Sequence, residues 1–201
     1  RLQGPTFTLW LLGVGALALG AAIDADAVIA AGWVALLLAA GLLELNLLAS
    51  LHGATATLAL PARLIALAQT FLPAGLLLAL TVTLIAGGEA PFVGPARSAL
   101  AALLLVGWIG LTVAGSLLHL LAILTRVRSL ARATPAPPPA LDRGLTAFAG
   151  LGVGGLALSD APGLGPLATP AGAVLAAIVC LLATRVGILA ISAARPIRPT
   201  T

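Results

Sequence analysis

The stretch GLLELNLLASLH, residues 41–52, places a carboxylate, an amide and an imidazole directly after a long apolar run. Every residue from Ala27 to Leu43 is apolar or glycine, so Glu44 must find a partner or water within apolar surroundings. Asn46 and His52 follow within the next eight residues. Ionisable groups inside apolar runs are by default candidates for proton, ion or ligand handling.

Other polar side chains interrupt apolar runs at a similar depth. Counted at about 1.5 Å per residue from the middle of each run, Glu44 lies about 7 Å and Arg185 about 5–6 Å toward the same side. Because their charges are opposite, we expect the two to face the bundle interior and to pair, directly or through water. A structural ion pair and a functional relay both stay open. The whole predicted polar layer comprises Glu44, Asn46, Gln69, Ser116, His119 and Arg185.

Three polar residues of the fourth run suggest an interior stripe, and the two histidines of the chain suggest a metal hypothesis. Thr112, Ser116 and His119 share one helical face, which predicts a polar stripe toward the interior. His52 and His119 are the two histidines of the chain and hence the candidate haem or copper ligands. Their depths differ by about 7 Å, and the chain adds only one cysteine and no methionine. We therefore predict no cofactor and leave haem or copper open.

The elements that must position these groups are apolar helices. Hydrophobic residues make up 61% of the 201 residues and charged residues only 8%, whereas a soluble domain carries about 25% charged residues. A transmembrane helix needs roughly 20 apolar residues. The sequence predicts an all-α membrane domain over 1–201 with about six spans, at about 6–23, 27–51, 63–86, 98–124, 143–159 and 170–193.

Charges alternate between the two sides of these six runs. Asp24, Asp26, Glu89, Asp160 and Arg97 fall on one side. By the positive-inside rule the other side is cytoplasmic, so both termini and the Arg/Pro-rich loop 125–142 face the cytoplasm of a bacterial plasma membrane. Arginines there act as topology anchors and attract anionic lipid headgroups. Besides Arg1, these anchors are Arg63, Arg126, Arg128, Arg132, Arg143, Arg195 and Arg198.

Small residues and one proline predict details of helix packing. Gly150 with Gly154, and Gly110 with Ala114, stand four residues apart and so allow close helix approach. Pro73 lies within the third run, where it is expected to kink the helix. The chain begins at Arg1 and not at methionine, so we expect a further segment to precede it.

Two stretches resemble a known group of membrane proteins. LLLVGWIGLTVAGSLLHLLAILTRVR, residues 103–128, and HGATATLALPARL, residues 52–64, are similar to segments of actinobacterial multispan proteins associated with multicopper-oxidase or copper nitrite-reductase-like domains. These are distantly similar to the NnrS and haem–copper oxidase membrane folds. The resemblance carries over His52 only, because Leu100 stands near the place of the histidine that relatives have before the GW pair.

Three functions follow from these patterns as alternatives. The leading one is an accessory, non-catalytic integral subunit of a bacterial membrane complex, which the resemblance links to respiration, electron transport, copper or nitrogen oxides. The second is a small transporter or proton conductor that uses Glu44, Arg185 and His119. The third is a haem- or copper-binding redox domain. The expected partners are lipid and other membrane subunits, while the few aromatic residues offer no platform for nucleic acid.

Overall fold

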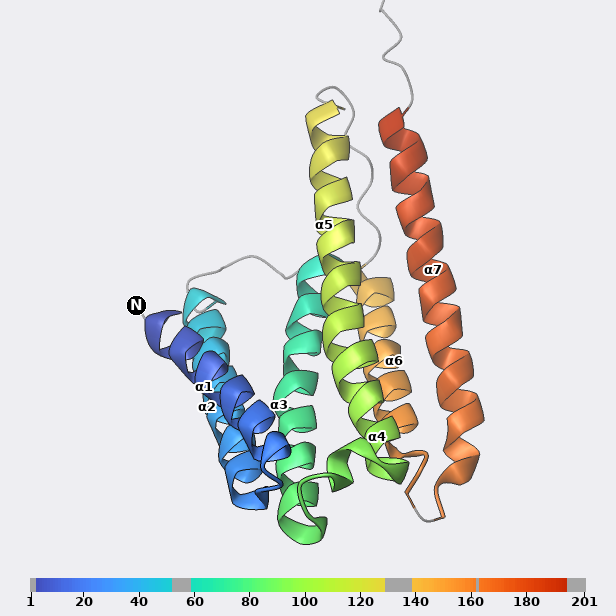
Figure 1. Ribbon diagram of the computed structural model, residues 1–201. Coiled ribbons are helices and arrows are strands. Elements are labelled where there is room, and N and C mark those ends of the chain that lie inside the picture. The colour runs from blue at the N-terminus through green and yellow to red at the C-terminus, as the bar shows by residue number, and fades with distance from the viewer. Residues whose placement is uncertain (1–2, 52–58, 129–138, 162, 195–201) are drawn as a thin grey trace, which may run out of the picture.

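The computed structural model describes residues 3–51, 59–128, 139–161 and 163–194 (Figure 1). Within these ranges every regular element is helical. From Gly94 to Arg128 the chain is helical through three consecutive elements, α4, η2 and α5, of which the middle one, η2, is a π-helix. The elements are α1 (Gln3–Ala22), α2 (Asp26–Leu51), α3 (Leu60–Ala86), η1 (Ala90–Phe92), α4 (Gly94–Ala101), η2 (Ala102–Gly110), α5 (Leu111–Arg128), α6 (Pro139–Leu158), η3 (Gly165–Leu167) and α7 (Ala168–Ala194).

Five helical segments of the described chain are long and apolar enough to cross a membrane. They confirm an all-α bundle of the kind that multi-pass membrane proteins have. The predicted fifth run, 143–159, corresponds to α6, which begins earlier and is not among the five. Asp142 and Arg143 in its first turns and its many glycines lower its hydropathy. The five segments are Gln3–Ala22, Asp26–Ala49, Leu60–Ala86, Gly94–Leu124 and Gly165–Ile188.

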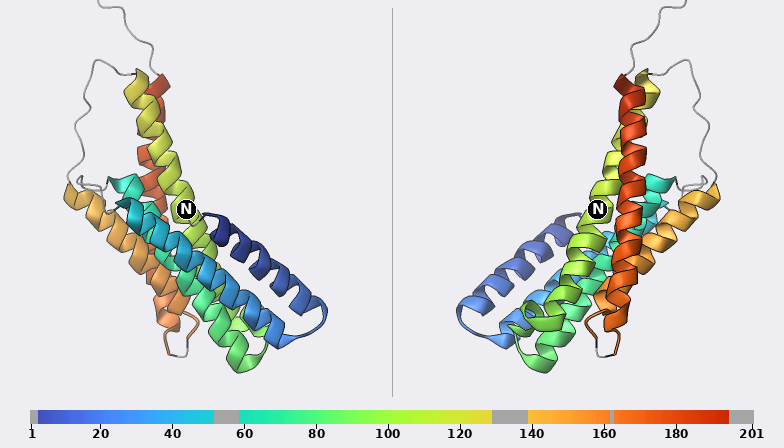
Figure 2. Two further views of the ribbon diagram at one scale, coloured as in Figure 1. Left: turned by 90° about the vertical axis from the view of Figure 1, so that its left-hand side faces the viewer. Right: turned by 90° about the vertical axis from the view of Figure 1, so that its right-hand side faces the viewer.

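The first two helices form a hairpin that joins the bundle through α2. Asp24 turns the chain with a φ of 53°, a conformation that Asp adopts more readily than most residues. A Cβ added to Gly13 would lie 2.7 Å from the Cγ of Leu36, and one on Gly32 would lie 2.9 Å from the Cγ of Leu17. Within the described elements α1 contacts only α2. Figure 2 shows the hairpin leaning away from α5 and α7.

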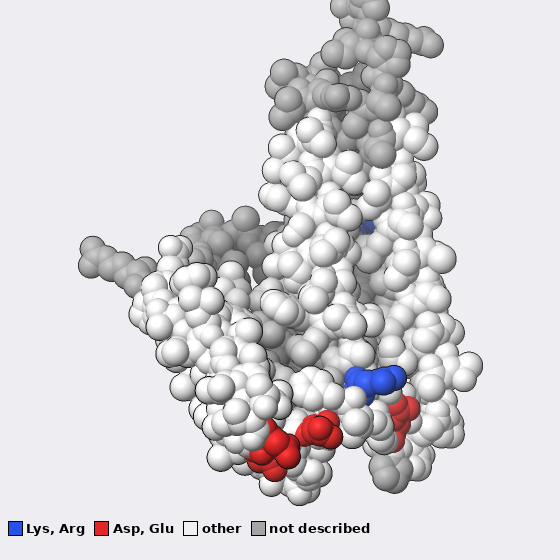
Figure 3. Space-filling model, in the orientation of Figure 1, with Lys and Arg blue, Asp and Glu red and all other residues white. Residues whose placement is uncertain are grey.

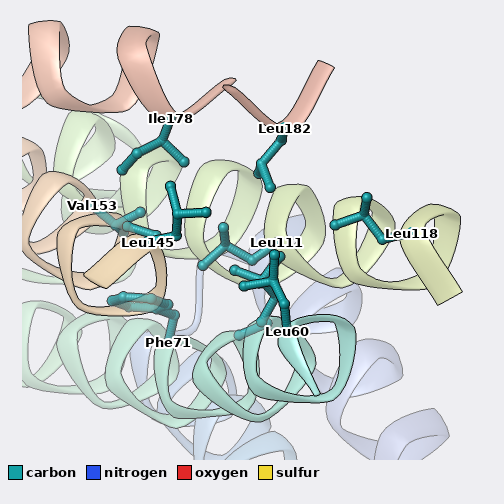
Figure 4. Packing of buried hydrophobic residues seen from close by; sticks show 11 residues of the cluster. Leu60, Phe71, Leu111, Leu118, Leu145, Val153, Ile178 and Leu182 are labelled. Atoms are coloured by element: carbon teal, nitrogen blue, oxygen red, sulfur yellow. The ribbon is translucent and has the colours of Figure 1, made fainter. Parts of the chain in front are cut away.

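Helix α3 is the centre of the bundle and runs without interruption through Pro73. It contacts α2, α4, η2, α5 and α6. On one side, Leu64 and Phe71 of α3 belong to a buried cluster shared with α5, α6 and α7 (Figure 4). On the other side, Leu72 and Leu76 belong to a cluster shared with α2 and α4. Trp108 packs against both clusters and so links them.

Glycines bring α3 and the π-helix η2 close together. A Cβ on Gly107 would lie 2.7 Å from the Cγ of Phe71, and one on Gly75 would lie 2.6 Å from a methyl of Leu104. The predicted packing glycines contribute less. Gly150 has ordinary contact distances to Leu67, and Gly154 faces open space, so its predicted role in helix packing is wrong.

These distances predict unequal effects of two Gly→Ala changes. Gly107→Ala should lower the free energy of unfolding by roughly 1–3 kcal/mol, because the added methyl overlaps Phe71. Gly154→Ala is the matched control and should be neutral or stabilising by up to about 1 kcal/mol, since Ala favours helix. Thermal unfolding in detergent measures both variants. Equal stability of the two variants would contradict the close α3–η2 contact.

Candidate functional site

Arg185 binds a carboxylate, but not the predicted one. Its Nη1 donates a hydrogen bond to Oδ1 of Asp142 over 2.9 Å, linking α7 to α6. The side chains are 23% and 15% exposed, respectively. The predicted pairing with Glu44 is therefore wrong. Hydropathy alone assigns Asp142 to the loop 125–142, whereas α6 begins at Pro139 and takes Asp142 into its first turn.

The alignment of α6 with α7 supports this ion pair. Gly152 packs against Leu175, with a Cβ at Gly152 placed 2.8 Å from the Cγ of Leu175. Gly152 comes ten residues after Asp142, and Leu175 comes ten residues before Arg185. Two antiparallel helices in one register bring both pairs together. The ion pair therefore lies on the regular α6–α7 interface.

Glu44 lies in a different part of the bundle, on the α2–α3 side. Helix α2 contacts α1 and α3 but, within the described residues, neither α5 nor α7. The backbone N–H of Gly88 donates to Oδ1 of Asp26 over 2.7 Å, which fixes the level of α2 against α3. Measured along the helices from this contact, Glu44 and Gln69 both lie about 27–29 Å away. They share one level on adjacent antiparallel helices, Glu44 half-buried and Gln69 buried.

The α2–α3 polar level holds oxygen atoms that are shielded from solvent. The Oε1 atoms of Glu44 and Gln69 are both buried and make no hydrogen bond to a described residue. Asn46 is half-buried two residues further along α2. The predicted polar layer is thus not one site, because Glu44 and Gln69 lie on α2–α3 whereas Arg185 binds Asp142 on the α6–α7 interface.

Ser116 and His119 do not face the interior. Both side chains are exposed on α5, so the predicted interior stripe is wrong at these two positions. The reason is that α5 turns another face toward its neighbours. Gly115 packs against Ile65 and the carbonyl oxygen of Pro61, and Leu118 is buried. A spacing of i, i+4 and i+7 through the apolar residues 111, 115 and 118 was the signal for the buried face.

No candidate metal site is formed within the described part of the chain. No group of three or more His, Cys, Asp or Glu side chains converges there. His52 lies outside the described residues, and His119 and Cys180 are exposed on α5 and α7. The side chains of five predicted anchors also lie outside what the structure describes, namely Arg126, Arg128, Arg132, Arg195 and Arg198.

Charges gather at the ends of the bundle. One end, here called the acidic end, carries Asp24, Asp26, Glu89 and Asp160 in or beside its connections, together with Arg97 (Figure 3). Arg63 and Arg143 lie in the first turns of α3 and α6, away from this end. Between the acidic end and the level of Arg63 and Arg143, large hydrophobic side chains are exposed on the helix surfaces, as a bilayer requires.

One open groove lies between α3 and α6, and no sequence pattern predicted it. Its volume is about 920 Å³, and Arg63 and Arg143 line it together with Thr70 and Thr146. The remaining lining residues are Ala66, Leu67, Ala147, Gly150 and Leu151. The groove depends on α3 and α6 being neighbours, which hydropathy does not reveal.

Comparison with family models, with curated proteins and with solved structures gives no match for this chain. The resemblance of 52–64 and 103–128 to copper-associated multispan proteins therefore stays a prediction.

The ion pair predicts a specific energetic coupling. Asp142→Asn leaves Arg185 without its carboxylate and should cost about 1.5–3 kcal/mol of unfolding free energy. In an Arg185→Gln background the same change should cost much less, since the interaction is already gone. Glu44→Gln is the control and should be additive with Arg185→Gln. Chemical unfolding of the single and double variants measures the coupling, and a coupling to Glu44 in place of Asp142 would contradict the observed pair.

Proposed function

We propose that this chain is a non-catalytic, membrane-embedded subunit of a larger bacterial membrane assembly. The observation that supports it is an apolar extension, formed by α5 and α7, that runs beyond the ends of α3 and α6 (Figure 1). Partner helices would cover this extension. The proposal concerns the role of the chain as a scaffold and assigns it no reaction.

The extension follows from the register of the helices. Gly115 packs at the carbonyl oxygen of Pro61, the second residue of α3, so the part of α5 that follows reaches past the start of α3. Arg185 lies beside the first turn of α6, so the last two turns of α7 reach past the start of that helix. Segment Gly94–Leu124 has 31 residues. At about 46 Å it exceeds the hydrocarbon core of roughly 30 Å.

The described surface of the extension is mostly apolar, although Ser116 and His119 are also exposed on it. Large hydrophobic side chains on it are between 43% and 61% exposed. A helix longer than the hydrocarbon core must tilt or find cover, and large exposed apolar patches mark interaction sites. The extension lies beyond the first residues of α3 and α6, where these two helices no longer flank α5 and α7. Protein partners supply cover there. The side chains are Leu117, Leu120, Ile123, Leu124, Ile188 and Ile191.

No observation favours a relay or redox role to the same degree. Glu44 lies on α2, His119 is exposed on α5 and Arg185 is bound to Asp142 on the α6–α7 interface. Charged side chains in the described part instead join helices, as Asp26 joins α2 to the α3 end and Asp142 joins α6 to α7. A link to respiratory or copper complexes rests on the resemblance alone.

Site-specific photo-crosslinking tests the subunit role. A crosslinking residue in place of Leu120 or of Ile188 should capture one defined polypeptide in native membranes. Leu11 on α1 is the matched control, because it is 60% exposed but far from the extension, and it should give lipid adducts only. A monomeric mass in mild detergent, with identical adducts at all three positions, would contradict the proposal.

A further inference from the structure

The groove between α3 and α6 has the composition of a lipid site. Both helices begin at the same end, away from the acidic end, and run in the same direction (Figure 1). Arg63 is the fourth residue of α3 and Arg143 the fifth of α6. Both line the groove, so two guanidinium groups stand at one end of a largely apolar channel.

The acidic residues of the chain lie on other helices or at the acidic end, or are already bound. All six acidic residues lie within the described ranges. Four of them are at the acidic end, Glu44 is on α2, and Asp142 binds Arg185 on α7. Arg143 has no ion-pair partner among the described residues. An external anion would complement the charge of Arg143.

Helix ends add to the attraction for an anion. Helix N-termini carry partial positive charge and expose backbone N–H groups. The N-cap of α3, Ala59, makes no side-chain capping bond, and two parallel helices present their N-termini together. The partial positive charge of the two helix N-termini adds to the charge of the guanidinium groups. In an antiparallel helix pair, the negative end of one helix would offset the positive end of the other.

The rest of the groove suits an acyl chain. Beyond the arginines it is lined mostly by apolar residues, among them Leu67, Ala147, Gly150 and Leu151. The hydroxyls of the two lining threonines, Thr70 and Thr146, donate to backbone carbonyls of their own helices. Gly150 adds no side chain to the groove, where a Cβ would lie 3.5 Å from a methyl of Leu67. Counted from Gly88 at the acidic end, Arg63 lies about 37 Å along α3. That distance exceeds the hydrocarbon core and falls within the full bilayer thickness, which is the depth of a headgroup.

We propose that this groove binds one anionic phospholipid. Arg63 and Arg143 bind its phosphate by charge-assisted hydrogen bonds, and one acyl chain lies along the α3–α6 channel. The shape selects a lipid over a free anion, because the apolar part of the groove would otherwise stay uncovered. The site does not depend on the subunit role.

Native mass spectrometry of the detergent-purified chain with added lipid tests the site. With phosphatidylglycerol the chain should retain one lipid, and phosphatidylcholine should be retained at least about tenfold less. The double variant Arg63→Gln, Arg143→Gln should lose this preference. Arg97→Gln, which removes a charge at the acidic end, is the matched control and should keep it.

A second variant separates the apolar part of the site from its charge. Ala147→Phe places a ring in the groove at an exposed position, so the fold should persist while retention of phosphatidylglycerol falls. Thermal unfolding of each variant without lipid confirms that it is folded. Equal retention of both lipids by the unmodified chain, or unchanged retention in the double variant, would overturn the proposal.

Discussion

Hydrocarbon does not solvate charge, and this constraint accounts for where the charged side chains of the bundle lie. Placing one alone near the centre of a bilayer costs upwards of about 2.5 kcal/mol. The described chain meets the constraint in two ways. Most charges stand near the helix ends, and there Arg185 of α7 is paired with Asp142 in the first turn of α6. Glu44 on α2 is an exception, because its Oε1 is buried without a hydrogen bond to a described residue. The ion pair also fixes the alignment of α6 with α7, which in turn determines how far α7 extends and where the groove beside α6 begins.

Helix α3 connects the two sides of the bundle, because its residues pack into both buried clusters. Gly75 and Gly107 let α3 and the π-helix η2 approach closely, and Trp108 joins the two buried clusters. This close contact sets the position of α5. Helix α7 in turn packs against both α5 and α6. The hairpin α1–α2 is attached on the other side, through α2 and the Asp26–Gly88 hydrogen bond. Glu44 and Arg185 consequently lie on different sides of α3.

Hydropathy predicted the helices well but not their neighbours. Long apolar runs are a local property, so the all-α bundle and most helix positions followed from the sequence. Which helices touch is not a local property, and for that reason Arg185 was paired with Glu44 and not with Asp142. The outward direction of Ser116 and His119 could have been read from Gly115 and Leu118, whose spacing marks the buried face of α5. The groove depends on two parallel helices and left no pattern in the sequence.

A charge exchange between α6 and α7 tests the central claim most directly, namely that Arg185 is held by Asp142. Arg185→Asp and Asp142→Arg each place two like charges together and should each lower the unfolding temperature in detergent strongly. Both changes in one chain should restore most of it, less a small loss because an arginine then stands at the N-terminus of α6. If the exchange restores nothing, while Glu44→Arg rescues Arg185→Asp, then Arg185 belongs with α2 and the arrangement described for α6 and α7 is contradicted.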